Sequence, residues 1–407
     1  MSAKTMEEIP GTRMGASTSR PRRICVDGVS TVLAGGVTYM SCLVNALARA
    51  APHWTFDVVV STGPLADKLD RLPNIRLHRA AWARGGAARF VYRQTALVAL
   101  ADRLRADVLL VQFPGLLLAD RPQVMIAMNS HYVMEPPVAP DARSRFYRRV
   151  QRFLFSVGYR RCQRTVFVSE QMAQLGRRFV GRDRTRGVVI YEAASPVMHR
   201  LAASVPPYAE RKVEPYLLAV GTVASHKNYA VMVRAYGELA RRLPDGPRLK
   251  IAGYFGALDA FRRGAGPRPA LLDLAEREGV ADRIDFLGSV SDEELGALFS
   301  RCLAFVSTSL LEAFNLTVVE AMAFGVPLLV PDTSAYPEQC GDSVLYADPS
   351  DPKSVAEQMY RLATDRDLRE EYARRASERG RLYSWERSAE QYLRVLEDIA
   401  RPRASSC

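Results

Sequence analysis

The chain has 407 residues, which predicts two domains, because single hydrophobic cores rarely grow beyond about 250–300 residues. Its 48% hydrophobic and 25% charged residues are typical of a soluble globular protein, and no run of 18 apolar residues predicts a membrane-spanning helix. The net charge of +12 (56 basic minus 44 acidic residues) fits a phosphorylated ligand or an anionic surface, but without a zinc-finger, RRM-like or zipper pattern we expect no nucleic-acid partner.

The first residues and the cysteines indicate where the protein works. Residues 1–21 are polar and lack the apolar region of a secretory signal, so we expect a disordered leader. The six cysteines are scattered and show no C-x-x-C spacing, so no structural zinc site is predicted. Without an export signal they are expected to be reduced thiols, which predicts a cytoplasmic protein.

Strand-sized apolar runs alternate with helix-sized amphipathic runs along the chain, which predicts parallel sheets covered by helices. In the first half, strands are predicted at 23–29, 56–61, 108–112, 123–128 and 165–169. A glycine loop is predicted at 33–36, and helices are predicted at 37–50, 90–105 and 143–161.

The same alternation returns in the second half. Strands are predicted at 216–221, 249–253, 284–287, 303–307 and 327–330, and helices at 228–243, 271–278, 292–300 and 388–400. Three prolines (Pro196, Pro206 and Pro207) are expected to interrupt any regular element between the halves. The predicted fold is therefore α/β, with two Rossmann-like, doubly wound domains at 22–200 and 210–385 and a helix at 386–400 that crosses back to the first domain. The ligand is expected in a cleft at the carboxyl ends of the strands.

The most informative segment runs from residue 309 to residue 330. Glu312 and Glu320 have seven residues between them, the first in a predicted loop and the second in a short helix that begins near Thr317 and ends at Gly325. A helix N-terminus can bind phosphate, and glutamates on either side of it can accept hydrogen bonds from sugar hydroxyls. These residues therefore predict a nucleotide-sugar site. Alternatively, Thr317 and Glu320 form a simple capping box, and Glu312 is a solvated carboxylate.

Two glycine-containing loops also follow predicted strands. Gly35 and Gly36 could bring backbone amides to a phosphate, or they could form a plain tight turn. Lys227 ends a loop that begins at Gly221, and there it could neutralise a diphosphate leaving group or be an ordinary surface charge. Asn228, the next residue, is a good N-cap for the helix that follows.

Two more loops follow strands in the same way. Ser291 and Glu294 predict a capping box, and the loop before them, with Gly288 and Val290, could lie along a nucleobase. His131 could hydrogen-bond a donor sugar, or it could be merely solvated.

In this order, the motifs resemble the retaining glycosyltransferases of family 4, which have the GT-B fold, and the resemblance covers nearly all of the chain after about residue 22. It implies that Glu320 holds the ribose hydroxyls, that Glu312 holds the hydroxyls of the transferred sugar, and that Lys227 binds the diphosphate. The residues it assigns to donor binding are Gly35, Gly36, Gly221, His226, Lys227, Gly288, Val290, Glu312, Ala313, Phe314, Asn315, Leu316, Thr317 and Glu320. It assigns catalysis to Lys227, Glu312 and His131, with the amides of 314–317 and Gly36 forming a phosphate cradle and with no metal or other cofactor.

Three positions depart from the family pattern. The family usually has Gly-Phe-Gly-Leu-Pro where this chain has Ala-Phe-Asn-Leu-Thr at 313–317, and a basic residue where this chain has His226. The segment Asn-Ser-His at 129–131 also replaces the common His-Asp or His-Gly. The departures bear on the identity of the donor and on contacts near the sugar more than on the type of reaction.

The resemblance implies a bacterial, cytoplasmic hexosyltransferase of carbohydrate or natural-product biosynthesis. Its acceptor hydroxyl would belong either to a lipid-linked or cell-envelope glycan or to a soluble natural-product intermediate. Residues 143–164 interleave arginines with aromatics, which suits weak contact with the cytoplasmic face of an anionic membrane, although we favour an ordinary helix with a solvated basic face. A GT-B nucleotide-sugar epimerase and a catalytically silent sugar-nucleotide-binding protein remain alternatives.

Overall fold

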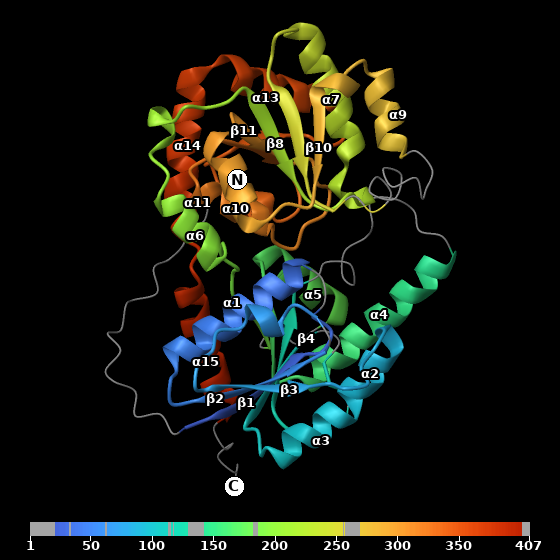
Figure 1. Ribbon diagram of the computed structural model, residues 1–407. Coiled ribbons are helices and arrows are strands. Elements are labelled where there is room, and N and C mark those ends of the chain that lie inside the picture. Colours follow the sequence, from blue (N-terminus) through green and yellow to red (C-terminus); the bar gives the residue numbers. More distant parts are fainter. Residues whose placement is uncertain are drawn as a thin grey trace.

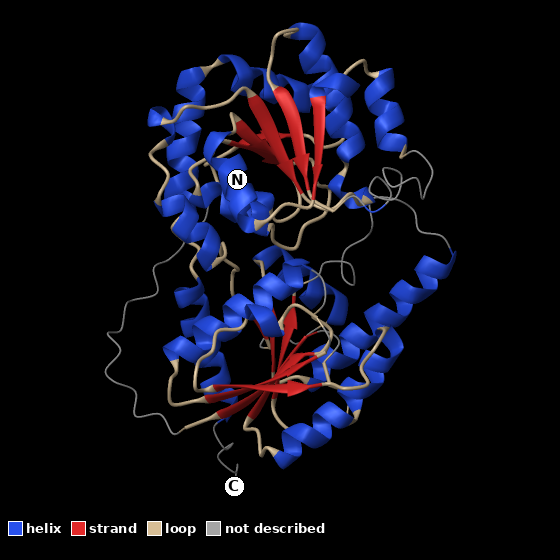
Figure 2. Cartoon of the chain, viewed as in Figure 1, coloured by secondary structure: helices blue, strands red, loops and turns tan. Residues whose placement is uncertain are grey.

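The protein is built from two parallel β-sheets, each flanked by helices, as Figures 1 and 2 show. The computed structural model describes residues 21–31, 34–61, 63–112, 115–116, 118–128, 142–181, 186–254, 256 and 269–400. The predicted leader, apart from Pro21, and His131 lie outside these residues. The predicted α/β class and the two Rossmann-like domains are confirmed.

The N-terminal sheet has seven strands in the order β3-β2-β1-β4-β5-β6-β7, and every neighbouring pair is parallel. The strands are β1 (Arg23–Gly28), β2 (Thr55–Val60), β3 (Ile75–Arg79), β4 (Val108–Gln112), β5 (Gln123–Ala127), β6 (Arg164–Phe167) and β7 (Gly187–Val189). The central strands are apolar on both faces, as expected of a sheet covered by helices on both sides. In β4, for example, the four residues from Val108 to Val111 are completely buried.

The C-terminal sheet has six parallel strands in the order β10-β9-β8-β11-β12-β13. The strands are β8 (Tyr216–Val220), β9 (Arg248–Ala252), β10 (Ile284–Gly288), β11 (Ala304–Val306), β12 (Leu328–Pro331) and β13 (Leu345–Ala347). In both sheets the strand order reverses beside the first strand of the domain, β1 or β8. This reversal is the place where open α/β sheets bind ligands.

Helices connect the strands, and the described residues include four short 3-10 turns between them. The N-terminal helices are α1 (Ala34–Ala50), α2 (Gly86–Gln94), α3 (Ala96–Arg103), α4 (Ala142–Arg161), α5 (Glu170–Val180) and α6 (Pro196–Ala203). The others are α7 (Tyr229–Arg242), α9 (Ala270–Arg277), α10 (Asp292–Arg301), α11 (Leu316–Ala323), α12 (Tyr336–Cys340), α13 (Pro352–Thr364), α14 (Arg366–Gly380) and α15 (Trp385–Ala400). The turns are η1 (Ala66–Lys68), η3 (Tyr208–Glu210), η4 (Ser225–Lys227) and η5 (Ala281–Arg283).

Two sequence predictions about helices are wrong. The helix predicted at 90–105 is two helices, α2 and α3, which meet at Thr95 in a non-helical backbone conformation. Pro196 does not interrupt regular structure either, because it occupies the first turn of α6, where a missing N–H costs nothing. The five described cysteines are buried and free. Among the described helices, none combines the length and apolar composition that crossing a lipid bilayer requires.

The two domains meet through residues that follow the carboxyl ends of their strands. The ring of Tyr191, after β7, lies 6.0 Å from that of Phe314, after β11. The final helix, α15, packs against α1 of the N-terminal domain, as Figure 1 shows, and the hydroxyl groups of Tyr39 and Tyr392 lie 2.5 Å apart in that contact. The carboxyl ends of both sheets therefore face each other, which brings their loops to one place.

Candidate functional site

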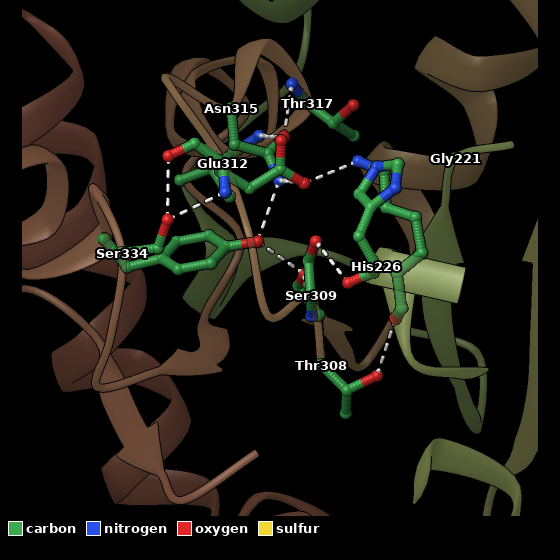
Figure 3. A network of polar contacts seen from close by, with 12 residues as sticks. Gly221, His226, Thr308, Ser309, Glu312, Asn315, Thr317 and Ser334 are labelled. Carbon is green, nitrogen blue, oxygen red and sulfur yellow. Dashed lines mark hydrogen bonds and ion pairs between the residues drawn. The ribbon is translucent and has the colours of Figure 1, made fainter. Parts of the chain in front are cut away.

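Lys227 is held in place by the loop that follows β11. It ends the turn η4, between β8 and α7. The hydroxyl group of Thr308 donates to the carbonyl oxygen of Lys227 at 3.2 Å, and the backbone N–H of Leu310 donates to that of His226 at 2.7 Å. Figure 3 shows the loop and the turn side by side. These bonds fix the turn that carries Lys227 against the loop that carries Glu312.

The side chains of Lys227 and Glu312 form an ion pair, with 2.6 Å between Nζ and Oε1. They are 20% and 12% exposed, so water screens the pair only partly. The backbone of Glu312 is fixed as well, since its N–H donates to the hydroxyl of Ser334 and that hydroxyl donates to its carbonyl oxygen, both at 2.7 Å. Glu312 is therefore a loop residue with a defined position, and no sequence pattern predicts that Ser334 holds it.

The helix α11 begins directly after this loop, and its N-cap is Asn315. Oδ1 of Asn315 accepts hydrogen bonds from the N–H groups of Thr317 (3.1 Å) and Val318 (3.4 Å). The capping box that was the alternative for Thr317 and Glu320 is therefore wrong. The helix ends as predicted at Gly325, whose φ of 57° is left-handed.

Two of the four amides predicted to cradle a phosphate already have partners. The N–H of Asn315 donates to Oε1 of Gln339 at 3.2 Å, and the N–H of Thr317 donates to Asn315 itself. Within the described chain, the N–H groups of Phe314 and Leu316 have no hydrogen-bond partner. These two amides therefore keep a hydrogen-bond donor that no described residue uses.

Glu320 lies in the second turn of α11 and faces a different set of charges. Burial raises the pKa of its carboxyl group to about 8, the negative charge of Asp292 adds to this, and the positive charge of Lys68 opposes it. Asp292 begins α10 after the loop predicted to lie along the base, and Lys68 belongs to the N-terminal domain. Among the described residues, no hydrogen bond or ion pair joins Glu320 to Lys227 or Glu312. Glu320 thus marks the side of the site next to α10.

The loops on either side of these residues differ from prediction in two details. Gly35 and Gly36 lie in the first turn of α1 rather than in a loop, and a Cβ atom added to either would meet no heavy atom within 4 Å, so space is open beside both. Asn228 precedes α7 as predicted, but its side chain donates to the carbonyl oxygen of Pro349 at 2.7 Å and does not cap the helix. Its left-handed φ of 55° is the cause, because capping residues need an extended backbone.

The remaining predicted positions lie around the ion pair and α10. A Cβ atom on Gly221 would lie 3.5 Å from Cε of Lys227, so Gly221 is next to the lysine side chain. Gly288 has a left-handed φ of 78°, which favours glycine, and Val290 is half-buried in the loop after it. The capping box of Ser291 and Glu294 at the start of α10 is confirmed.

Sequence reasoning missed Glu192, a buried carboxyl group that follows β7. The residue is only 4% exposed, and no described residue donates a hydrogen bond to its carboxylate. Burial raises its pKa to about 8, and the negative charge of Glu312 adds to the effect. Its place after a strand, at the sheet edge where the other site residues lie, was the available signal.

Comparison with known proteins assigns the chain to a family. The family model "Glycosyltransferase Family 4" matches residues 33–195, and "Glycosyl transferases group 1" matches residues 204–379. O-antigen chain mannosyltransferase B of Escherichia coli is 31% identical over 178 residues, 44% of each chain. D-inositol 3-phosphate glycosyltransferase of Corynebacterium urealyticum is 30% identical over 185 residues, 44% of this chain and 42% of that protein. The chain thus aligns with less than half the length of these relatives.

Solved structures share the fold over nearly the whole chain. Sucrose-phosphate synthase of Thermosynechococcus elongatus superposes with a TM-score of 0.74 at 18% identity, covering 93% of this chain and 99% of that one. Anabaena HepE, solved in complex with UDP and glucose, gives a TM-score of 0.66 at 16% identity, covering 93% and 100%. These structures show the fold, and the family models show the relationship. The chain therefore belongs to glycosyltransferase family 4 and has the GT-B fold.

Proposed function

We propose that this glycosyltransferase is retaining and independent of metal, and that it moves a sugar from a nucleoside-diphosphate sugar to an acceptor hydroxyl group. The observation that carries the proposal is the 2.6 Å contact between Lys227 and Glu312, beside the start of α11. It places a cation, a carboxylate and helix N-terminal amides together. The cation and the amides can bind a diphosphate, and the carboxylate can accept hydrogen bonds from sugar hydroxyls.

In the proposed reaction, the bond between the anomeric carbon and the diphosphate oxygen breaks first. Lys227 and the free amides at the start of α11 stabilise the negative charge that develops on the leaving diphosphate. The acceptor oxygen then bonds to the same face of the anomeric carbon, and its proton passes to the departing phosphate. Fixed charges and dipoles of this kind lower barriers by about 3–4 kcal/mol each. Because Lys227 and the helix supply the positive charge, the proposal includes no metal.

The other predicted residues take supporting roles. Glu312 would accept hydrogen bonds from the transferred sugar and Glu320 from the ribose, with Gly36 at the phosphates from the opposite domain. His131 keeps its proposed place near the sugar. Gly35, Gly221, His226, Gly288, Val290 and Ala313 complete the proposed donor contacts.

The acceptor is proposed to meet the N-terminal domain of a cytoplasmic protein. The relative that acts on O-antigen chains supports a cell-envelope glycan, and a soluble natural-product intermediate is the alternative. The helix α4, which extends outward in Figure 1, supports membrane contact because Phe146 and Phe153 are 70% and 67% exposed on a helix rich in arginine. Exposed aromatics between arginines suit the headgroup region of an anionic bilayer.

The donor is tested by mixing the protein with a panel of sugar nucleotides and measuring thermal unfolding. A bound donor raises the unfolding temperature by mass action, so one base and one sugar should stand out. The stabilising donor is then incubated with candidate acceptors after treatment with EDTA, and the anomeric configuration of the product is read by NMR. Retention without metal supports the proposal, whereas inversion or dependence on a metal contradicts it. Conversion of the donor to its epimer would identify an epimerase, and binding without transfer or hydrolysis a silent binding protein.

Membrane contact is tested by flotation with phosphatidylglycerol vesicles at low salt. The wild-type protein should float with these vesicles and stay behind with phosphatidylcholine vesicles. Replacing Phe146 and Phe153 by Ser should abolish flotation, while Leu287→Ser, which changes an exposed apolar residue of the other domain, should not. A wild-type protein that stays behind with both vesicle types would favour the soluble acceptor.

A further inference from the structure

Asn315 contacts both parts of the proposed donor site. It is only 5% exposed, and its carboxamide is shared between α11 and the loop before it. On one side Oδ1 accepts from the N–H groups of Thr317 and Val318, at 3.1 and 3.4 Å. On the other side Nδ2 donates to the hydroxyl of Tyr336 at 3.0 Å and to Oε1 of Glu312 at 3.4 Å. Figure 3 shows Asn315 between Glu312 and Thr317.

In this arrangement Lys227 and the amides of Thr317 and Val318 are paired with groups of the protein itself. Lys227 is neutralised by the same oxygen of Glu312 that Asn315 contacts. The amide of Thr317 donates to Oδ1 of Asn315, in the place where a phosphate oxygen would bind a helix N-terminus. The amide of Val318 is shared between this Oδ1, at 3.4 Å, and the backbone carbonyl oxygen of Asn315, at 3.1 Å. A diphosphate that enters must take Lys227 from Glu312 and compete with Asn315 for the amides.

We propose that Asn315 is a positioning residue that links the two ends of the donor: it orients Glu312 toward the sugar and competes with the diphosphate for the first amides of α11. The inference rests on the proposed function, because it needs a donor with a diphosphate and a sugar. The backbone of Asn315 is held at both its N–H and its carbonyl oxygen by Gln339, at 3.2 and 2.8 Å. The side chain can therefore release the amides without moving the loop.

The alternative is that Asn315 only caps α11, and two substitutions separate the roles. Asn315→Ser keeps a good N-cap oxygen but loses the amide nitrogen that reaches Glu312 and Tyr336. Asn315→Gly removes the capping oxygen as well and costs little stability at an N-cap. Asp365→Gly is the matched control, because Asp365 caps α14 by accepting the N–H of Leu368 at 2.9 Å.

The experiment measures, by calorimetry, the dissociation constants of the donor found in the panel and of its nucleoside diphosphate, with kcat and KM for transfer. In Asn315→Ser the nucleoside diphosphate should bind as tightly as in wild type. The sugar's contribution to binding, which is the ratio of the dissociation constants of the nucleoside diphosphate and the donor, should fall about threefold to tenfold, as for one lost hydrogen bond. The value of kcat should fall by a similar factor. In Asn315→Gly the same losses should appear, but the diphosphate alone should bind about threefold more tightly because its competitor is gone.

A double substitution tests whether Asn315 acts through Glu312. Adding Asn315→Ser to Glu312→Gln should lower the sugar's contribution to binding no further than Glu312→Gln alone. Three results would overturn the inference. The first is that the two substitutions lower the sugar's contribution to binding additively, and the second is that the diphosphate binds Asn315→Gly more weakly than wild type. The third is that the Asn315 variants bind and react like Asp365→Gly. If the wild-type protein binds no sugar nucleotide of the panel, the proposed function itself fails. If the wild-type protein binds a donor and the Asn315 variants bind it equally well, only the inference about Asn315 fails.

Discussion

Glu338 and Glu170 belong to different domains, and Oε1 of Glu338 accepts the backbone N–H of Glu170 at 2.6 Å. Oε2 accepts the N–H of Gln171 at 2.9 Å. These amides begin α5, where N–H groups lack partners within the helix and a negative charge is favourable. A carboxylate of the C-terminal domain therefore caps the N-terminus of a helix in the N-terminal domain.

Replacing Glu338 by Ala should loosen the contact between the domains. Two charge-assisted hydrogen bonds disappear, and the free energy of unfolding should fall by about 1.5–3 kcal/mol. Small-angle scattering should show a larger radius of gyration. Glu378→Ala is the control, since among the described residues Glu378 pairs only with Arg374, on the exposed face of α14. Unchanged scattering and stability would mean that Glu338 does not hold the domains together.

The hydroxyl pair of Tyr39 and Tyr392 should behave as a coupled unit. The two oxygens lie 2.5 Å apart in the buried contact between α1 and α15. Replacing either residue by Phe leaves the other hydroxyl buried without a partner and should cost about 1–3 kcal/mol in urea unfolding. The double substitution should cost less than the sum of the single ones. Additive costs would mean that the pair does not connect the helices.

Much of the fold could be predicted because its central strands are continuous apolar runs. The strand β3 escaped prediction because it lies at the sheet edge, and its residues Arg76, His78 and Arg79 break the apolar pattern. The sequence predicts a loop at the first turn of α1 because Gly35 and Gly36 are poor helix formers, a preference that packing overrides.

The residues of the site could be predicted more readily than their partners. Lys227, Glu312 and Glu320 stand in recognisable loops and helix starts, so the sequence pattern makes them candidates, and the family resemblance assigns their roles. Ser334 accepts a hydrogen bond from Glu312, which is distant in the sequence, and Asn315 accepts one from Thr317 within a tight turn. No rule of residue spacing predicts either bond. Asn315 departs from the family pattern, which the sequence shows, but only the three-dimensional arrangement shows its contacts with Glu312 and Tyr336.

The buried carboxyl group of Glu192 should make stability depend on pH. Its pKa is about 8 in the folded protein against an ordinary value of 4.5, because of burial and the charge of Glu312. The neutral form is favoured in the folded state, so its stabilising effect is complete below about pH 4.5 and is lost as the pH rises through 8. The free energy of unfolding should therefore fall over this range, by a few kcal/mol at most (~1.4 kcal/mol per pKa unit).

Glu192→Gln isolates this contribution, because glutamine cannot lose the proton. The charged and titratable groups that act on or respond to Glu192 are Glu312, Tyr39 and Tyr392, and all of them are retained in the variant. Urea unfolding at pH 5, 6.5 and 8 (about ±1.5 units around the midpoint) should give a flatter profile for the variant than for wild type. Identical profiles would contradict the assignment.

Glu320 should determine recognition of the ribose. If its carboxyl group binds a ribose hydroxyl, the wild-type protein should bind the nucleoside diphosphate of its donor about tenfold more tightly than the analogue that lacks that hydroxyl. Glu320→Ala should bind the two ligands equally, because the half-buried carboxyl group that would bind the hydroxyl is gone. The 2′-deoxy and 3′-deoxy analogues are both measured, by calorimetry. A variant that keeps the wild-type preference would remove Glu320 from the ribose site.

The most direct test of the central claim is the rate of sugar transfer by Lys227→Ala. If Lys227 stabilises the leaving diphosphate, kcat should fall roughly a hundredfold or more, as when a preorganised electrostatic group is removed. Lys353→Ala, which changes an exposed lysine at the start of α13, should keep the wild-type rate, and both variants should unfold cooperatively. A Lys227→Ala protein that is folded and transfers sugar at nearly the wild-type rate would contradict the account.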